Sequence, residues 1–195
     1  MKQLIKQLLN TFGLDIIKLN TKGIGRMDLL LGRLKDLGLT CNSIFDVGAN
    51  KGHWSLMAKT YYPDSNFVLI EPLEELSADL KRFCDQNENS RYFMVGVGSK
   101  EDVLTLTIWD DLAGSSFLPK ADQDLLNSGK QRPITIKTID GLIKEHNLSI
   151  PELIKLDIQG FELEALKGAT SLFGKTEVFI LEVSMFKPDD LPEAP

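Results

Sequence analysis

Apolar residues from Ser43 onward fall into short runs separated by amphipathic segments. The runs occupy residues 43–47, 66–71, 91–97, 152–157 and 176–183. Apolar residues at helical spacing fill the intervals 52–61, 73–86 and 160–173. Several runs are nearly continuous in Val, Ile, Leu and Phe, which is typical of strands covered on both faces. This alternation predicts an α/β fold with a mostly parallel, twisted sheet and helices on both faces.

Residues 101–110 and 133–138 interrupt the alternation, because both have the two-residue period of further strands. The connection between them, residues 111–132, is polar and contains Gly114 and Pro119. A connection of this length in a compact domain is more often functional than idle. We therefore expect this segment to contact a substrate.

Residues 1–40 are expected to form an N-terminal helical segment, and residues 41–195 the main domain, within one globular unit. Helical spacing predicts an amphipathic helix over residues 1–20 and a second helix over residues 27–37, ending at Gly38. The first helix is interpreted as covering an edge of the domain, with membrane attachment as the alternative. Polar residues interrupt it before a signal peptide or a membrane span could form. The protein is therefore expected to be cytoplasmic, without stable membrane insertion.

The charge and the cysteine content argue against nucleic-acid binding and against a metal site built from cysteines. The chain of 195 residues has a net charge of -6 and no block of basic residues, so nucleic acid is not an expected partner. Cys41 and Cys84 stand far apart, without the spacing of metal ligands. We interpret both as reduced, buried thiols.

A glycine-containing turn, Gly48-Ala49-Asn50-Lys51-Gly52, follows the first predicted strand and opens a helix. Glycine lets backbone N–H groups approach a ligand closely, and a helix N-terminus favours anionic groups. Asp46, inside the strand, is expected to support the turn by a hydrogen bond. A dinucleotide site needs G-x-G-x-x-G, and here Asn50 replaces the middle glycine. The turn therefore favours a ligand without a pyrophosphate.

Glu71 ends the second apolar run and precedes Pro72. In mononucleotide-binding α/β folds, an acidic residue at this place accepts hydrogen bonds from ribose hydroxyls. The alternative is a glutamate that faces solvent at the end of a strand.

Asp157 and Gln159 follow the fourth predicted parallel strand, which in a doubly wound sheet lies beside the first. Both side chains would then face the same crevice as Asn50. A carboxylate there can hold a substrate hydroxyl or receive its proton. Alternatively, Asp157 caps the following helix, and both roles are compatible.

Three weaker candidates complete the set. His53 opens the first helix and could act as a base, although a packed or solvent-bonded histidine is the more common case. Glu182 follows an apolar run, where a buried carboxylate needs a partner. Asp46, Asp157 and Glu182 could also supply oxygen ligands to a cation such as magnesium, but their spacing does not require it. We therefore assign no metal ligands.

As a set, six segments resemble the FkbM-type methyltransferases, a branch of the class I S-adenosylmethionine-dependent enzymes. The segments are FDVGANKGHWS (45–55), LIEP (69–72), Gly114-Ser115-Ser116, Thr138-Ile139-Asp140, IKLDIQGFELEALKGA (154–169) and VFILEVS (178–184). The resemblance implies a Rossmann-like class I fold and methyl transfer, usually to a hydroxyl oxygen of a sugar or secondary metabolite.

Carried over by position, the resemblance also implies roles for individual residues. Gly48, Asn50 and Gly52 would cradle the methionine end of the cofactor, and Glu71 would hold the ribose. Val97 and Gly98 would border the adenine, and Asp157 and Gln159 would line the reaction crevice. Ser115 and Ser116 would lie near cofactor or acceptor.

Two departures from the family pattern bear on activity. Gln159 stands where many relatives have a glutamate, and an amide cannot act as a base at neutral pH. A proton acceptor must then be Asp157, His53 or water. The chain also stops at Pro195, so we expect it to lack the C-terminal strand pair of the family, and an uncovered sheet edge would favour a homo-oligomer.

These departures leave alternatives to an active O-methyltransferase. One is a module that binds S-adenosylmethionine without catalysis. The other, which the turn disfavours, is a nucleotide-dependent oxidoreductase.

Overall fold

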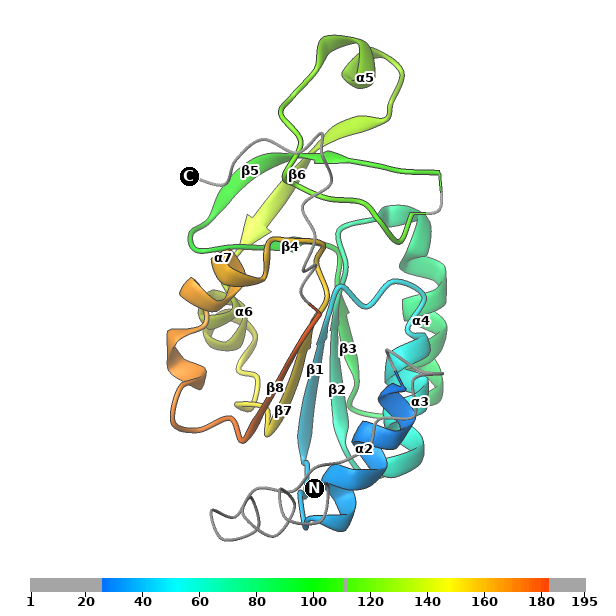
Figure 1. The fold of residues 1–195 in the computed structure, drawn as a ribbon, viewed down its shortest axis with the longest axis vertical. Helices are drawn as coiled ribbons and strands as arrows, with labels where there is room; N and C mark the ends of the chain where they lie inside the picture. The colour runs from blue at the N-terminus through cyan, green and yellow to red at the C-terminus, as the bar shows by residue number, and fades with distance from the viewer. Residues whose placement is uncertain (1–25, 111, 183–195) are drawn as a thin grey trace, which may run out of the picture.

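A five-stranded parallel sheet forms the centre of the fold in the computed structural model, which describes residues 26–110 and 112–182 (Figure 1). The strand order is β3 (Arg91–Phe93), β2 (Asn66–Ile70), β1 (Ser43–Val47), β7 (Leu153–Leu156) and β8 (Val178–Leu181). All four neighbouring pairs are parallel. The sequence prediction of a parallel sheet is confirmed, and so is the position of the fourth predicted strand, β7, beside β1.

Helices cover both faces of this sheet, and each face has its own apolar core (Figure 1). One face packs against α2 (Met27–Asp36), α3 (His53–Tyr61) and α4 (Ser77–Gln86), the last preceded by the 3-10 turn η1 (Glu74–Leu76). The other packs against α6 (Ile139–His146), α7 (Glu162–Lys167) and the 3-10 turn η2 (Thr170–Leu172). The three central strands β2, β1 and β7 therefore bury side chains in both directions, which explains their continuous apolar runs.

A second sheet of three strands stands beyond the carboxyl ends of the parallel strands (Figure 1). Its order is β4 (Gly96–Val97), β6 (Gln131–Lys137) and β5 (Asp102–Thr107), with β5 antiparallel and β4 parallel to β6. It encloses a small core that includes Leu73, Leu106 and Ile136.

The predicted single strand over residues 91–97 is wrong, because the chain divides it between the two sheets. Phe93 pairs with β2 in the parallel sheet, whereas Gly96 pairs with Ile136 in the second sheet. The 111–132 connection contains the short helix α5 (Gln123–Asn127), and its last residues begin β6.

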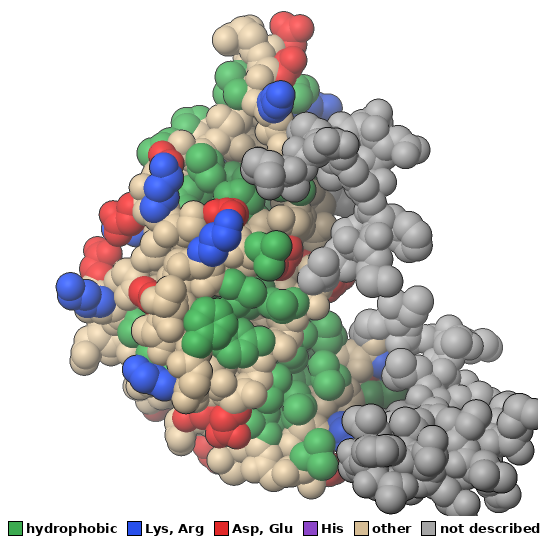
Figure 2. All heavy atoms as spheres, turned by 60° about the vertical axis from the view of Figure 1, so that its left-hand side comes forward, with side chains coloured by type: hydrophobic (Ala, Val, Ile, Leu, Met, Phe, Trp, Pro, Cys, Tyr) green, Lys and Arg blue, Asp and Glu red, His purple; other side chains and the backbone are tan. Residues whose placement is uncertain are grey.

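Apolar side chains gather on the face that carries α6 and α7 (Figure 2). Leu163, Phe173 and Leu181 are exposed, and Phe173 stacks on Phe179 of β8 with ring centroids 5.7 Å apart. Among the described residues, β8 pairs only with β7 and so forms an edge of the parallel sheet. Self-association at this edge stays a prediction. The predicted lack of the C-terminal strand pair falls on residues beyond Glu182, outside the described residues.

The predictions for the N-terminal helices and for the cysteines agree with the structure only in part. The helix expected over residues 1–20 lies outside the described residues, whereas the helix expected over residues 27–37 is present as α2. The cysteines are free but half-buried rather than buried. Burial raises the pKa of Cys41 to about 12 and that of Cys84 to about 11.

Candidate functional site

The glycine turn lies at the carboxyl end of β1, against the end of β7. Gly48 has a φ of +76°, and a Cβ placed on it would lie 1.9 Å from the backbone oxygen of Asp157. The amide of Asp157 donates to the carbonyl of Val47 at 3.0 Å, which holds the two strand ends together. Glycine at position 48 is therefore required by the close approach of another backbone.

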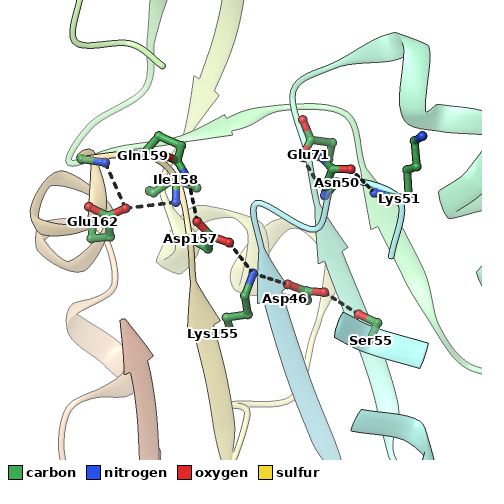
Figure 3. Close-up of polar contacts among 11 residues, drawn as sticks. Asp46, Asn50, Lys51, Ser55, Glu71, Lys155, Asp157, Ile158, Gln159 and Glu162 are labelled. Carbon is green, nitrogen blue, oxygen red and sulfur yellow. Dashed lines mark hydrogen bonds and ion pairs between the residues drawn. The ribbon is translucent and has the colours of Figure 1, made fainter. Parts of the chain in front are cut away.

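The amides of the turn are already hydrogen-bonded within the chain. Those of Gly48 and Ala49 donate to the carbonyl of Ile70, and that of Gly52 donates to the carbonyl of Ala49. The Asn50 amide donates to Glu71 Oε2, and the Lys51 amide to Asn50 Oδ1 (Figure 3). The prediction that the turn offers free N–H groups to a ligand is wrong for residues 48–52.

Glu71 joins the turn to the end of β2. Its Oε2 accepts from the Asn50 amide at 2.9 Å, and its Oε1 accepts from the Leu73 amide at 3.1 Å. The side chain is buried, and this burial raises the pKa of Glu71 against the opposing effect of the two amides. The alternative of a solvent-facing glutamate is therefore wrong.

A row of alternating charges crosses the sheet beneath the turn (Figure 3). Ser55 of α3 donates to Asp46 Oδ2 at 2.7 Å, and Lys155 Nζ lies 3.4 Å from Asp46 Oδ1 and 3.2 Å from Asp157 Oδ2. Asp46 and Lys155 face each other in the register of β1 and β7. Asp46 does not accept the expected hydrogen bond from the turn, since the turn amides donate to other acceptors. Asp46 instead accepts from Ser55 of α3 and from Lys155.

Burial dominates the electrostatics of this row. It raises the pKa of Asp46, and the Lys155 ammonium and the Ser55 hydroxyl only partly oppose it. Burial alone would lower the pKa of Lys155, but the carboxylates of Asp46 and Asp157 outweigh it and raise that pKa. Lys155 is therefore a fixed cation held by two carboxylates.

The segment after β7 is held by its own side chains. Gln159 Nε2 donates to Asp157 Oδ1 at 2.9 Å, and Glu162 Oε1 accepts from the amides of Ile158 and Gly160 at 3.0 and 3.1 Å (Figure 3). In the described chain α7 has Phe161 as its N-cap residue and no side-chain cap, and Glu162, the first residue of α7, accepts from amides that precede the helix. Of the two interpretations of Asp157, the helix cap is thus not supported.

These elements surround a cavity of about 270 Å³ at the carboxyl ends of β1, β2 and β7. Its lining contains eight of the residues singled out in the sequence, namely Gly48, Asn50, Glu71, Val97, Ser115, Asp157, Gln159 and Glu182. Glu182 follows β8, and the neighbouring charge of Asp157 raises the pKa of Glu182, with burial second. The structure therefore brings together side chains from four parallel strands.

Five other predicted site residues do not line the cavity; these are Asp46, Gly52, His53, Gly98 and Ser116. Gly52 precedes α3 and packs near Leu69, while His53 is exposed. A Cβ on Gly98 would meet Ile136. Ser116 Oγ donates to the carbonyl of Gln159 at 2.9 Å, so Ser116 fixes the segment after β7 rather than facing the cavity.

A magnesium site built from Asp46, Asp157 and Glu182 conflicts with this geometry, because Lys155 lies between the first two carboxylates. Among the described residues, no group of three or more His, Cys, Asp or Glu side chains could hold a metal ion.

Sequence reasoning missed Lys155, Glu162 and the apolar wall that Leu106 and Phe117 contribute from the second sheet and its loop. The sequence contained a feature that could have predicted the role of Lys155, because a lysine inside a buried parallel strand needs a carboxylate partner, and Asp46 lies inside the neighbouring strand. No sequence feature predicts the apolar wall, because it depends on how the second sheet packs against the first.

Comparisons with known proteins find methyltransferases. The chain is similar to "Methyltransferase 1" of Beauveria bassiana, with 25% identity over 142 residues, 64% of this chain and 57% of that protein. It is also similar to "Methyltransferase sdnD" of Sordaria araneosa, with 27% identity over 153 residues, 64% of this chain and 59% of that protein. The match thus spans less than three fifths of either relative. No solved structure matches significantly.

Within the described part of the chain, none of the helices has the length and apolar character needed to cross a membrane. The family model that matches is the methyltransferase FkbM domain, over residues 46–194. That range contains the turn, Glu71, Asp157 and Glu182, and it begins at the buried Asp46. From this match and the Rossmann-like arrangement of its sheet, the chain belongs to the FkbM methyltransferase domain family.

Proposed function

We propose that this domain binds S-adenosylmethionine in the cavity and transfers its methyl group to a hydroxyl oxygen of a small molecule, such as a sugar or secondary metabolite. The observation that carries the proposal is the convergence of Asn50, Glu71 and Asp157 on one cavity at the carboxyl ends of three adjacent strands. Ligands of open α/β sheets bind at this edge, where the strand order reverses.

The residues present fit the cofactor. Each Glu71 oxygen accepts one backbone N–H, and a carboxylate oxygen can accept more than one hydrogen bond. Glu71 can therefore also accept from two ribose hydroxyls. Ile70, Leu73 and Val97 supply an apolar wall suited to a purine ring. The cofactor supplies a methyl group on a positively charged sulfur.

The chain's own contribution to transfer is to align the acceptor and to receive its proton. Alignment of reacting groups can supply about 7–11 kcal/mol of a barrier. The acceptor oxygen would take the methyl group from the cofactor's sulfur, and Asp157 or water would receive the hydroxyl proton. Gln159 donates to Asp157 and so orients that carboxylate.

Titration calorimetry with S-adenosylmethionine and NADH tests the cofactor assignment. We expect binding of S-adenosylmethionine and none of NADH, since the turn has no free amides for a pyrophosphate. Tight binding of NADH without a response to S-adenosylmethionine would favour the oxidoreductase instead.

Glu71→Gln is expected to weaken S-adenosylmethionine binding by about 1.5–3 kcal/mol, because a carboxylate accepts stronger hydrogen bonds than an amide. Calorimetry measures the change, and circular dichroism checks the fold, since Glu71 also holds Asn50 and Leu73. The exposed Glu74, three residues along the chain, provides the matched control Glu74→Gln. If the two variants bound S-adenosylmethionine with equal affinity, Glu71 would not be the residue that holds the ribose.

Asp157→Asn is expected to lower turnover at least about 100-fold while cofactor affinity stays near that of the wild type, if Asp157 receives the proton. S-adenosylhomocysteine formation on a panel of alcohols and sugars measures this. Wild-type protein that binds the cofactor but methylates none of the panel would support the non-catalytic module.

A further inference from the structure

The cavity has an unbalanced negative charge. Glu71, Asp157 and Glu182 line it, and no Lys, Arg or His among the described residues does. The three carboxylates come from the ends of β2, β7 and β8, so they approach the cavity from different elements. The effect of Asp157 on the pKa of Glu182 indicates that these two charges act on each other across the cavity wall.

The nearest buried cation does not neutralise this charge. Lys155 is almost fully buried, with 6% of its side chain exposed, and its ammonium contacts both Asp46 and Asp157. Those two carboxylates already outnumber it by one. Lys155 is also absent from the cavity lining. Its charge therefore offsets one of the four carboxylates at and beneath the cavity, Asp46, Glu71, Asp157 and Glu182, and leaves the site with an excess of negative charge.

A second, independent observation concerns hydrogen-bond donors. Anion sites in α/β folds use backbone amides of the strand-to-helix turn. Here all five amides of residues 48–52 donate to acceptors of the chain itself. Similarly, the amides of Ile158 and Gly160 at the end of β7 donate hydrogen bonds to Glu162. The cavity thus lacks both the cations and the turn amides that an anion would require.

We propose that the cavity selects its ligands by net charge: it favours the cofactor, with its net positive charge, over the neutral thioether product, and it takes uncharged or cationic hydroxyl compounds but not phosphorylated ones. This rests on the proposed function and adds the class of acceptor. Glu182 is the carboxylate through which the selectivity is tested, since substitution of Glu71 or Asp157 would also disturb the turn or Gln159. The selection does not depend on one pose of the ligand. The cavity has a volume of about 270 Å³, so a ligand anywhere inside it lies within one Debye length, about 10 Å, of the lining carboxylates.

The test compares S-adenosylmethionine, which has one more positive charge, with S-adenosylhomocysteine by calorimetry at low salt. The wild type is expected to bind the former roughly tenfold more tightly, and Glu182→Gln to reduce that ratio roughly threefold. Glu177→Gln is the control, because Glu177 is exposed, as Glu182 is, but precedes the opposite end of β8. It removes the same charge and should leave the ratio unchanged.

Inorganic pyrophosphate is the anionic probe in the same experiment. It is expected not to displace S-adenosylmethionine from the wild type. Displacement by pyrophosphate, equal affinities for the two cofactor forms, or identical ratios in Glu182→Gln and Glu177→Gln would overturn the charge selection and leave the proposed cofactor site intact. Failure of both cofactor forms to bind would overturn the proposed function itself, and the charge selection with it.

Discussion

Gly48→Ala is expected to destabilise the domain by roughly 3–5 kcal/mol, a large part of the 5–15 kcal/mol typical of a protein this size. The new Cβ would lie 1.9 Å from the backbone oxygen of Asp157, which cannot rotate away as a side chain could. Relief requires the ends of β1 and β7 to separate, and this breaks the bond from the Asp157 amide to Val47. Overpacking and the positive φ add to the cost.

Urea denaturation of Gly48→Ala and Gly174→Ala measures this effect with a matched control. Gly174 has nearly the same φ, +77°, but a Cβ there would have no neighbour within 4 Å. Its substitution therefore reports backbone strain alone, about 1 kcal/mol. If both variants lost the same free energy of unfolding, the contact with Asp157 would not be the reason for glycine. Because Asp157 lines the cavity, we also expect Gly48→Ala to lose cofactor binding.

The comparison of sequence and structure shows which features a pattern can predict. The apolar run 43–47 matches β1 to the residue, because a strand buried on both faces leaves a continuous signal. The run 91–97 gives the same signal, yet the chain leaves the parallel sheet after Phe93 and pairs Gly96 with β6. Apolar character records burial but not the strand that supplies the hydrogen bonds.

The site was predictable where single side chains determine it, and less so where backbone does. Glu71 and Asp157 line the cavity, as their positions at the ends of strands predict, and their roles toward a ligand stay predictions. The glycine turn was recognised, but the reason for its glycine was not, since the contact of Gly48 with Asp157 joins residues far apart in the sequence. Nor could the sequence show that Ile70 and Glu71 already accept three of the turn amides.

Lys155→Met is the second substitution with a large expected effect, about 3–5 kcal/mol of lost stability near pH 8. The methionine fits the space but leaves the fully buried Asp46 with no cation and only the Ser55 hydroxyl as partner. Asp157 is partly exposed and can regain water. The cost therefore comes mainly from the uncompensated charge of Asp46.

The pH dependence of this loss identifies its cause. Burial already raises the pKa of Asp46, and removal of the ammonium raises it further. In the unfolded chain the same group ionises near pH 4. As the pH rises from that value to the higher pKa of the folded variant, the unfolded state loses its proton first, so stability falls. Below about pH 4 both states are protonated, and this part of the penalty disappears.

Urea denaturation of Lys155→Met at pH 5 and pH 8 is therefore expected to show a smaller loss, relative to the wild type, at the lower pH. The double variant Asp46→Asn/Lys155→Met removes both charges and should be more stable than Lys155→Met alone at pH 8. An equal loss at both pH values, with no recovery in the double variant, would assign the effect to packing around Trp54, whose ring centroid lies 5.8 Å from the ammonium. The expected result instead makes Lys155 the charge that opposes the effect of burial on Asp46 inside the sheet.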